Sequence, residues 1–200
     1  MIFGYLRETR ELAQKAGIDK TFNLYRTGLE DYLKVIFPNT NDWIHDKSTG
    51  IVELGRVRPD YRSESLKMII EFDGLPHYTN PIQIRKDKEE RTLKYQEYGY
   101  KVIRIPYFIQ LTKQVVKTLF NVDILQDLFN PNLPSLSITE NCSPAFLCID
   151  GIKRMAEEFH RFPEQYRVNL HYLKSIPKEN QYLARADLLE YFYNKSEREE

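Results

Sequence analysis

The sequence predicts an α/β (α+β) protein, in which a mixed β-sheet is flanked by helices and followed by a helical C-terminal appendage. Two short apolar segments, 67–72 and 101–106, are typical of buried strands. The segment between them has helical character, and the chain becomes loop-rich near residue 130 before further helical segments. A chain of 200 residues with 42% hydrophobic and 13% aromatic content can bury a substantial core.

The first elements are expected to be helices that cover the sheet. Segments 6–16 and 20–37 have helical patterning, and Leu29, Leu33 and Ile36 repeat at helical spacing within the second. The following segments predict a meander of short strands. These strands are expected at 43–45, 51–54, 57–61 and 67–72, with a turn at 48–50.

A long helix is predicted between the last two strands. Asn80 followed by Pro81 is typical of a helix start, and Gly99 closes the helix at about residue 98. Strand 101–106 and helix 111–120 should follow. The proline-rich and asparagine-rich segment after residue 130 indicates a boundary. We therefore expect a catalytic domain at 1–129, a linker at 130–150 and a helical subdomain at 151–200, with helices at 151–162, 164–173 and 180–193.

Acidic residues gather at the ends of two neighbouring strands. Side chains alternate along a strand, so Glu71 and Asp73 should share one face of segment 67–72. Antiparallel pairing through the turn at 63–65 would bring Asp60 toward Glu71. Carboxylate oxygens, completed by water and substrate phosphate, are the ligands that Mg²⁺ or Mn²⁺ prefers in phosphodiester chemistry.

Each acid also has a purely structural interpretation. Asp60 could cap a turn, and Asp73 with Gly74 is a common turn pair. Glu71 resists such an interpretation, because it lies among apolar residues where a carboxylate is costly to bury without a partner or a metal.

The ordered motifs resemble those of the PD-(D/E)XK nuclease superfamily. The sequence PDY at 59–61, IIEFDG at 69–74, His77, then Asp87 and Arg91 on a helix, and GYKVIRIPYF at 99–108 resemble its very-short-patch-repair-like and DUF559-type endonuclease branch. This resemblance covers about residues 29–108. It implies a restriction-endonuclease-like fold.

The resemblance also implies roles for individual residues. Asp60 and Glu71 would be the metal-binding acids, with the Phe72 carbonyl as a further ligand. His77 would orient the attacking water or polarise a phosphate, and Glu30 matches the acid of the first helix. Asp73 stands where the commonest form of the superfamily has lysine, so the usual lysine role is left unfilled.

Nucleic-acid contacts are expected from local clusters of basic residues. The chain has 29 basic and 29 acidic residues, so its formal net charge is zero and its nonspecific DNA affinity should be modest. The candidates for phosphate contact are Arg58, Arg62, Lys86 and Arg91. Asp87 and Arg91 are spaced i, i+4 and could equally form an ordinary helical ion pair.

Cysteine content and hydropathy predict a cytoplasmic protein with no membrane partner. Cys142 and Cys148 are the only cysteines, too few for a disulfide scaffold and without the paired spacing of a zinc module. No apolar stretch approaches membrane-spanning length.

The leading hypothesis is a Mg²⁺-dependent DNA endonuclease, in which Mn²⁺ can substitute, acting in restriction, repair or phage defence. One alternative is a non-cleaving nucleic-acid-binding module, which the neutral charge and the missing lysine favour. The other is a nuclease subunit that is active only with a partner protein. A homodimer or a larger partner could dock on the C-terminal helices.

Overall fold

A mixed four-stranded sheet forms the centre of the computed structural model, in the order β3-β4-β5-β6. The structure describes residues 18–19, 24–25, 29–55, 57–128, 132, 134–136, 147–180 and 184–196. Adjacent strands from β3 to β5 pair antiparallel, whereas β5 and β6 run parallel. The predicted mixed α+β architecture is therefore confirmed. The strands are β3 (Ile44–His45), β4 (Tyr61–Ser63), β5 (Met68–Asp73) and β6 (Lys101–Pro106).

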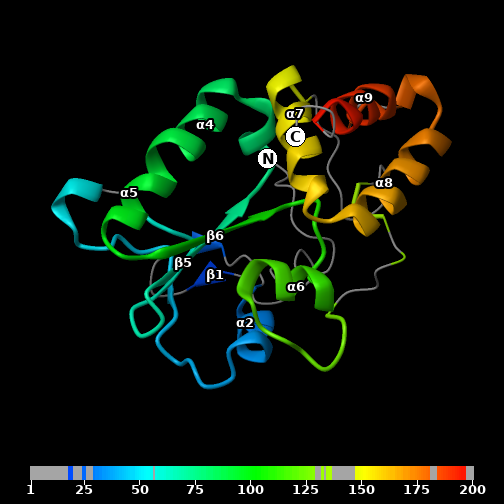
Figure 1. The fold of residues 1–200 in the computed structure, drawn as a ribbon. Helices are drawn as coiled ribbons and strands as arrows, with labels where there is room; N and C mark the ends of the chain where they lie inside the picture. The colour runs from blue at the N-terminus through cyan, green and yellow to red at the C-terminus, as the bar shows by residue number, and fades with distance from the viewer. Residues whose placement is uncertain are drawn as a thin grey trace.

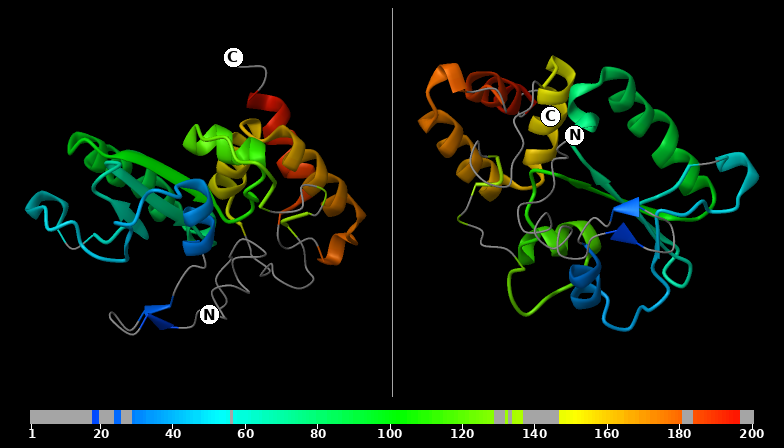
Figure 2. Two further views of the ribbon diagram at one scale, coloured as in Figure 1. Left: turned by 90° about the horizontal axis from the view of Figure 1, so that it is seen from below. Right: turned by 180° about the vertical axis from the view of Figure 1, so that it is seen from behind.

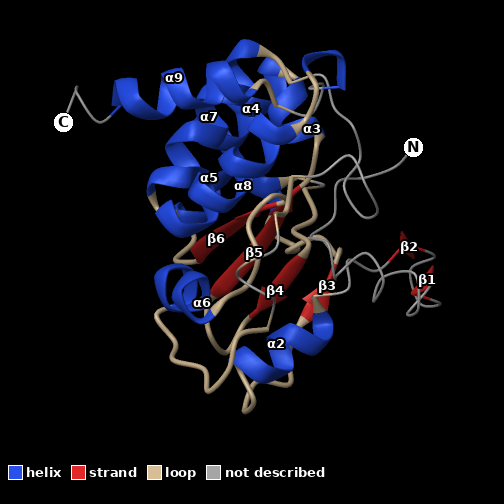
Figure 3. Ribbon diagram, turned by 90° about the vertical axis from the view of Figure 1, so that its right-hand side faces the viewer, coloured by secondary structure: helices blue, strands red, loops and turns tan. Residues whose placement is uncertain are grey.

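The two faces of β5 bury different side chains, as its alternating pattern requires. Ile70 packs into the main hydrophobic core, while its neighbour Ile69 packs into a smaller cluster with Tyr95. Helices cover both faces of the sheet (Figure 3). The helices α2 (Glu30–Ile36) and α6 (Lys113–Phe120) contribute to the main core.

The parallel strands β5 and β6 are joined by a helical crossover, which Figure 1 shows across the top of the sheet. Asn80 caps the start of the helical segment at Pro81, because the Asn80 side-chain oxygen accepts hydrogen bonds from the Ile82 and Gln83 N–H groups. Gly99 ends it with a φ of 78°, the left-handed conformation that glycine adopts without strain. The crossover consists of α3 (Pro76–Thr79), α4 (Pro81–Lys86), the π-helix η2 (Asp87–Arg91) and α5 (Thr92–Glu97).

The C-terminal helices lie beside the sheet and share its main core (Figures 1 and 2). Phe108, just after β6, packs against Phe159 with a ring separation of 4.9 Å. The buried Gln165 side chain both accepts from and donates to the backbone of Gln110, each at 2.8 Å. These helices are α7 (Ile149–His160), α8 (Pro163–Ser175) and α9 (Ala186–Ser196), with the short η3 (Lys178–Asn180) between the last two.

Two strand predictions were wrong. Segment 51–54 contains the 3₁₀ helix η1 (Val52–Leu54), and β4 begins only at Tyr61. Gly55 turns the chain with a φ of 60°, and Pro59 has no N–H to give to a neighbouring strand. Segment 57–61 therefore reaches the sheet only at its last residue.

The predicted helix at 20–37 was also wrong in its first part. Leu24–Tyr25 forms β2, which pairs with β1 (Ile18–Asp19), and the helix begins only at Glu30. The helical spacing of Leu29, Leu33 and Ile36 belongs to α2 and does not extend back to residues 24–25, which pair as a strand. The predicted helix at 6–16 lies outside the described residues.

None of the helices that the structure describes is both long enough and apolar enough to span a bilayer.

Candidate active site

Asp60 and Glu71 meet at the end of the β4–β5 pair that lies away from the connecting turn. The antiparallel register pairs Tyr61 with Ile70, so the next residue on each strand brings Asp60 beside Glu71. An Asp60 carboxylate oxygen accepts a hydrogen bond from the Phe72 N–H at 2.6 Å. Strand pairing therefore places the two acids together, as the sequence predicted.

In both acids of this pair, the effect of burial on the pKa outweighs that of the partners among the described residues. Burial raises the pKa of Asp60 to about 6, although the Phe72 N–H opposes the shift. Burial and the nearby Asp60 charge raise the pKa of Glu71 to about 8. The Glu71 Oε1 atom is buried and has no hydrogen-bond partner among the described residues. A cation would relieve the repulsion between these carboxylates.

A second polar cluster adjoins the first at the end of β5. His77 Nδ1 lies 2.5 Å from Asp87 Oδ2 and 3.3 Å from Asp73 Oδ1. One ligand atom from each of these residues lies within 4.8 Å of the others, a separation that a metal ion could bridge. We call Asp73, His77 and Asp87 the histidine cluster, and Asp60 with Glu71 the acid pair.

Two arginines form ion pairs with the carboxylates of the histidine cluster. Arg104 donates through Nε to Asp73 at 2.7 Å and also hydrogen-bonds through Nη2 to the same carboxylate. Arg154 donates to Asp73 at 2.6 Å and to Asp87 at 3.1 Å. Because two guanidinium groups already balance the two carboxylates, the histidine cluster is a poor site for a further cation. The acid pair fits Mg²⁺ better.

Proton positions in the histidine cluster follow from the charge of Asp87. Burial opposes ionisation, but the His77 hydrogen bond and the Arg104 charge lower the pKa of Asp87 to about 2. Asp87 is therefore an ionised acceptor near neutral pH, and His77 Nδ1 carries the shared proton. When the ring is neutral, Nε2 is its accepting nitrogen.

The other predicted site residues lie at different depths. Glu30 is the first residue of α2 and is partly exposed. The Asp73 side chain, which replaces the expected lysine, is completely buried. The Phe72 carbonyl accepts a hydrogen bond from the Gly74 N–H at 3.0 Å.

The four candidate phosphate-binding residues do not all face solvent. Lys86 is exposed on α4, and Arg91 is 37% exposed with a nitrogen 3.9 Å from Asp87. Arg58 is half exposed and pairs with Asp46 at 3.3 Å. Arg62 is buried, with a nitrogen 3.2 Å from Glu64, so it is not presented to a phosphate in this conformation.

Two residues of the site were not assigned a role from the sequence. Arg104 lies in the strand motif that carries the family resemblance, and a charged residue inside an apolar strand was a usable signal. Arg154 lies 81 positions from Asp73, and no local pattern marks it.

No protein-family model matches this chain, and neither do any of the curated proteins or solved structures with which it was compared. The resemblance to PD-(D/E)XK nucleases therefore stays a prediction. The geometry of the acid pair and the histidine cluster must carry any proposal about function.

Proposed function

We propose that this protein is a metal-dependent endonuclease that hydrolyses DNA phosphodiester bonds. The observation that carries the proposal is the acid pair, a half-buried and a buried carboxylate that lie side by side and whose pKa values are both raised. Strongly shifted carboxylates beside a histidine are more typical of a reaction centre than of a structural core. The restriction-endonuclease-like fold, suggested by the motifs, belongs to the same proposal.

Asp60 and Glu71 would hold Mg²⁺ or Mn²⁺, together with the Phe72 carbonyl. Hard carboxylate and carbonyl oxygens suit these ions, and the histidine cluster is already balanced by arginine. A metal bound there supplies Lewis-acid stabilisation of the phosphate and lowers the pKa of a coordinated water.

His77 would take the proton from the attacking water. Asp87 fixes Nδ1 as the hydrogen-bond donor, so Nε2 presents its lone pair. Asp87 thus acts on the reaction only through the orientation of the imidazole. This arrangement needs no lysine at the Asp73 position.

Exposed basic residues near the crossover would bind the DNA backbone. Arg91 acts on the acid pair itself, since its charge favours ionisation of Glu71. Lys86 and Arg58 would add further phosphate contacts, which act locally although the net charge of the chain is zero.

The decisive experiment is plasmid cleavage by the purified chain in Mg²⁺, Mn²⁺ or chelator. Asp60→Asn and Glu71→Gln keep the volume of each side chain and should abolish metal-dependent cleavage. Glu64→Gln, a change to an exposed carboxylate in the β4–β5 turn, should cleave normally. Undiminished cleavage by both acid-pair variants would contradict the proposal.

A non-cleaving DNA-binding module is the second candidate. The observation that favours it is Asp73, which replaces the catalytic lysine of related motifs and is tied to Arg104 and Arg154. This alternative predicts DNA binding that persists in chelator and no cleavage in any divalent metal.

A further inference from the structure

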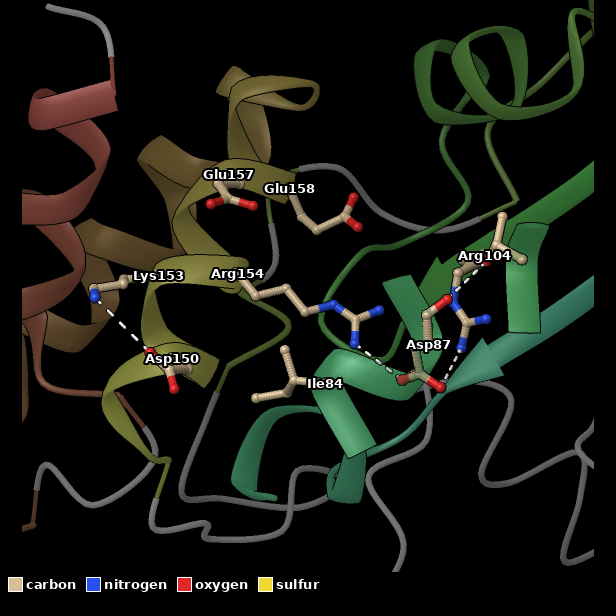
Figure 4. Close-up of a pocket in the computed structure, with 9 residues that line it drawn as sticks. Ile84, Asp87, Arg104, Asp150, Lys153, Arg154, Glu157 and Glu158 are labelled. Carbon is tan, nitrogen blue, oxygen red and sulfur yellow. Dashed lines mark hydrogen bonds and ion pairs between the residues drawn. The ribbon is translucent and has the colours of Figure 1, made fainter. Parts of the chain in front are cut away.

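Arg154 reaches from the C-terminal helices into the histidine cluster. Its Nη2 donates to Asp73 Oδ2 at 2.6 Å, and its Nη1 donates to Asp87 Oδ2 and to the His77 carbonyl oxygen, both at 3.1 Å. Figure 4 shows the side chain extending from α7 toward Asp87, which Arg104 approaches from another direction. One guanidinium group therefore ties together three members of the cluster.

Close backbone packing holds α7 at this distance from the cluster. Gly151 lies so near α3 that a methyl group on it would be 1.6 Å from the Tyr78 carbonyl oxygen. The Cys148 thiol also contacts this carbonyl at 3.5 Å, and the Arg154 guanidinium lies over the Tyr78 ring at 4.8 Å. The position of Arg154 is thus set by several contacts between α7 and α3.

The geometry of the imidazole depends on the two carboxylates that Arg154 holds. Asp87 Oδ2, which contacts His77 Nδ1, is the same oxygen that accepts from Arg154. Asp73 Oδ1 lies only 3.3 Å from the same ring nitrogen and is a competing acceptor. Arg154 binds the other oxygen of Asp73 and so restrains this competitor.

We propose that Arg154 is a positioning residue for His77, so the C-terminal helices complete the reaction centre. Its two-armed guanidinium fixes Asp73 and Asp87 relative to the ring, and Asp87 then remains the partner of Nδ1. This inference rests on the proposed nuclease function for its catalytic consequence. The positioning itself is a structural statement that can be measured without substrate.

The first measurement is the proton NMR spectrum of the full chain. The short Nδ1 to Asp87 contact should give His77 a strongly downfield ring N–H resonance, assigned by its loss in His77→Gln. Arg154→Ala should shift or abolish this resonance. Arg161→Ala should retain it, because that arginine pairs with Glu158 at the exposed end of α7.

The second measurement is cleavage kinetics of the same variants. Arg154→Ala should lower kcat at least tenfold and change KM for DNA less than twofold, since Arg154 does not bind substrate in this arrangement. Arg154→Lys should fall between the alanine variant and the wild type, because an ammonium group keeps the charge but lacks the planar fork.

Chemical rescue separates positioning from a general folding defect. A cleft of about 410 Å³ borders Arg154, Asp87 and Arg104, so a small cation can reach the vacated position. Millimolar guanidinium, far below denaturing concentrations, should restore both the downfield resonance and kcat of Arg154→Ala. Tetramethylammonium, which has no N–H donors, should restore neither.

An Arg154→Ala protein that keeps the wild-type resonance and kcat would overturn the proposal. If the alanine variant does not fold, Arg154→Lys is tested instead. A folded lysine variant with the wild-type resonance and the wild-type kcat would also overturn the proposal. If the wild type cleaves nothing but the resonance still depends on Arg154, the proposed function fails and the positioning role stands.

Discussion

The acid pair and the histidine cluster lie side by side and have opposite electrostatics. In the histidine cluster, hydrogen bonding and the Arg104 charge overcome burial and hold the pKa of Asp87 near 2. In the acid pair, burial dominates and raises the pKa of Glu71 to about 8. Among the described residues, two arginines bind the carboxylates of the histidine cluster and none is hydrogen-bonded to the acid pair, which is where the proposed cation would bind.

The largest effect should come from removing an arginine of the histidine cluster. Arg104→Met leaves the completely buried Asp73 with less compensation, so the free energy of unfolding should fall by about 3 to 5 kcal/mol. Urea unfolding measures the change. Arg58→Met, which breaks an exposed pair with Asp46, should cost less than about 1 kcal/mol. An equal fall in the free energy of unfolding in both variants would show that the buried ion pair matters no more to stability than the exposed one.

Removing the histidine should separate proton transfer from metal binding. His77→Gln is expected to lower kcat by about 10²-fold, equivalent to about 2.7 kcal/mol, since it removes the base and leaves the acid pair intact. Single-turnover cleavage across a Mg²⁺ titration tests this expectation. A weaker apparent affinity for Mg²⁺, with an unchanged maximal rate, would instead make His77 a metal ligand.

Neutralising the acid pair should stabilise the metal-free protein. The folded pKa of Glu71, about 8, exceeds its ordinary value of 4.5. Between these pH values the unfolded chain releases a proton that the folded chain retains, so the wild type loses stability as pH rises.

Glu71→Gln removes that loss and should raise the free energy of unfolding by at least about 2 kcal/mol above pH 8, with almost no gain below pH 4.5. Urea unfolding in chelator at several pH values gives the comparison. Glu64→Gln should give no such gain, because the pKa of that carboxyl is lowered. A pH-independent gain for Glu71→Gln would show that its charge is not the cause.

The smallest expected effect is stabilisation by Mg²⁺. At tenfold the dissociation constant, binding to the folded state alone adds about 1.4 kcal/mol. Differential scanning calorimetry should show this gain for the wild type and for His77→Gln, and not for Glu71→Gln. The same gain in all of them would place the ion outside the acid pair.

Local sequence patterns predicted most of this region. Alternation along one strand was enough to put Glu71 and Asp73 on one face, and antiparallel pairing brought Asp60 to Glu71. Asn80 and Gly99 marked the ends of the crossover helix because their roles depend on nearby backbone atoms. Such features are encoded within a few residues.

What the sequence did not reveal depends on long-range contacts. Arg104 and Arg154 meet Asp73 across 31 and 81 positions, distances over which neither helical nor strand periodicity carries information. The extended segment expected at 57–61 failed because Gly55 and Pro59 keep most of it out of the sheet. Arg154 comes from the C-terminal helices and helps to balance the charge of the histidine cluster. Its role can therefore be recognised only in the folded chain.

The π-helix η2 sets the rotation of α5 relative to α4 about the axis of the crossover helix. Asp87 and Tyr95 are eight positions apart, which a regular α-helix would rotate about 80° away from each other. Both are nevertheless almost fully buried, since the wider turn absorbs one extra residue and brings them onto the same side. A regular α-helix through the same eight positions would turn one of the two side chains away from the buried side, whereas deleting one residue from this turn would restore an α-helix and keep both on the same side. The crossover is thus built in two segments whose rotational offset aligns Asp87 with His77 and keeps Tyr95 beside Glu71, where burial and the Glu71 charge raise the pKa of the tyrosine.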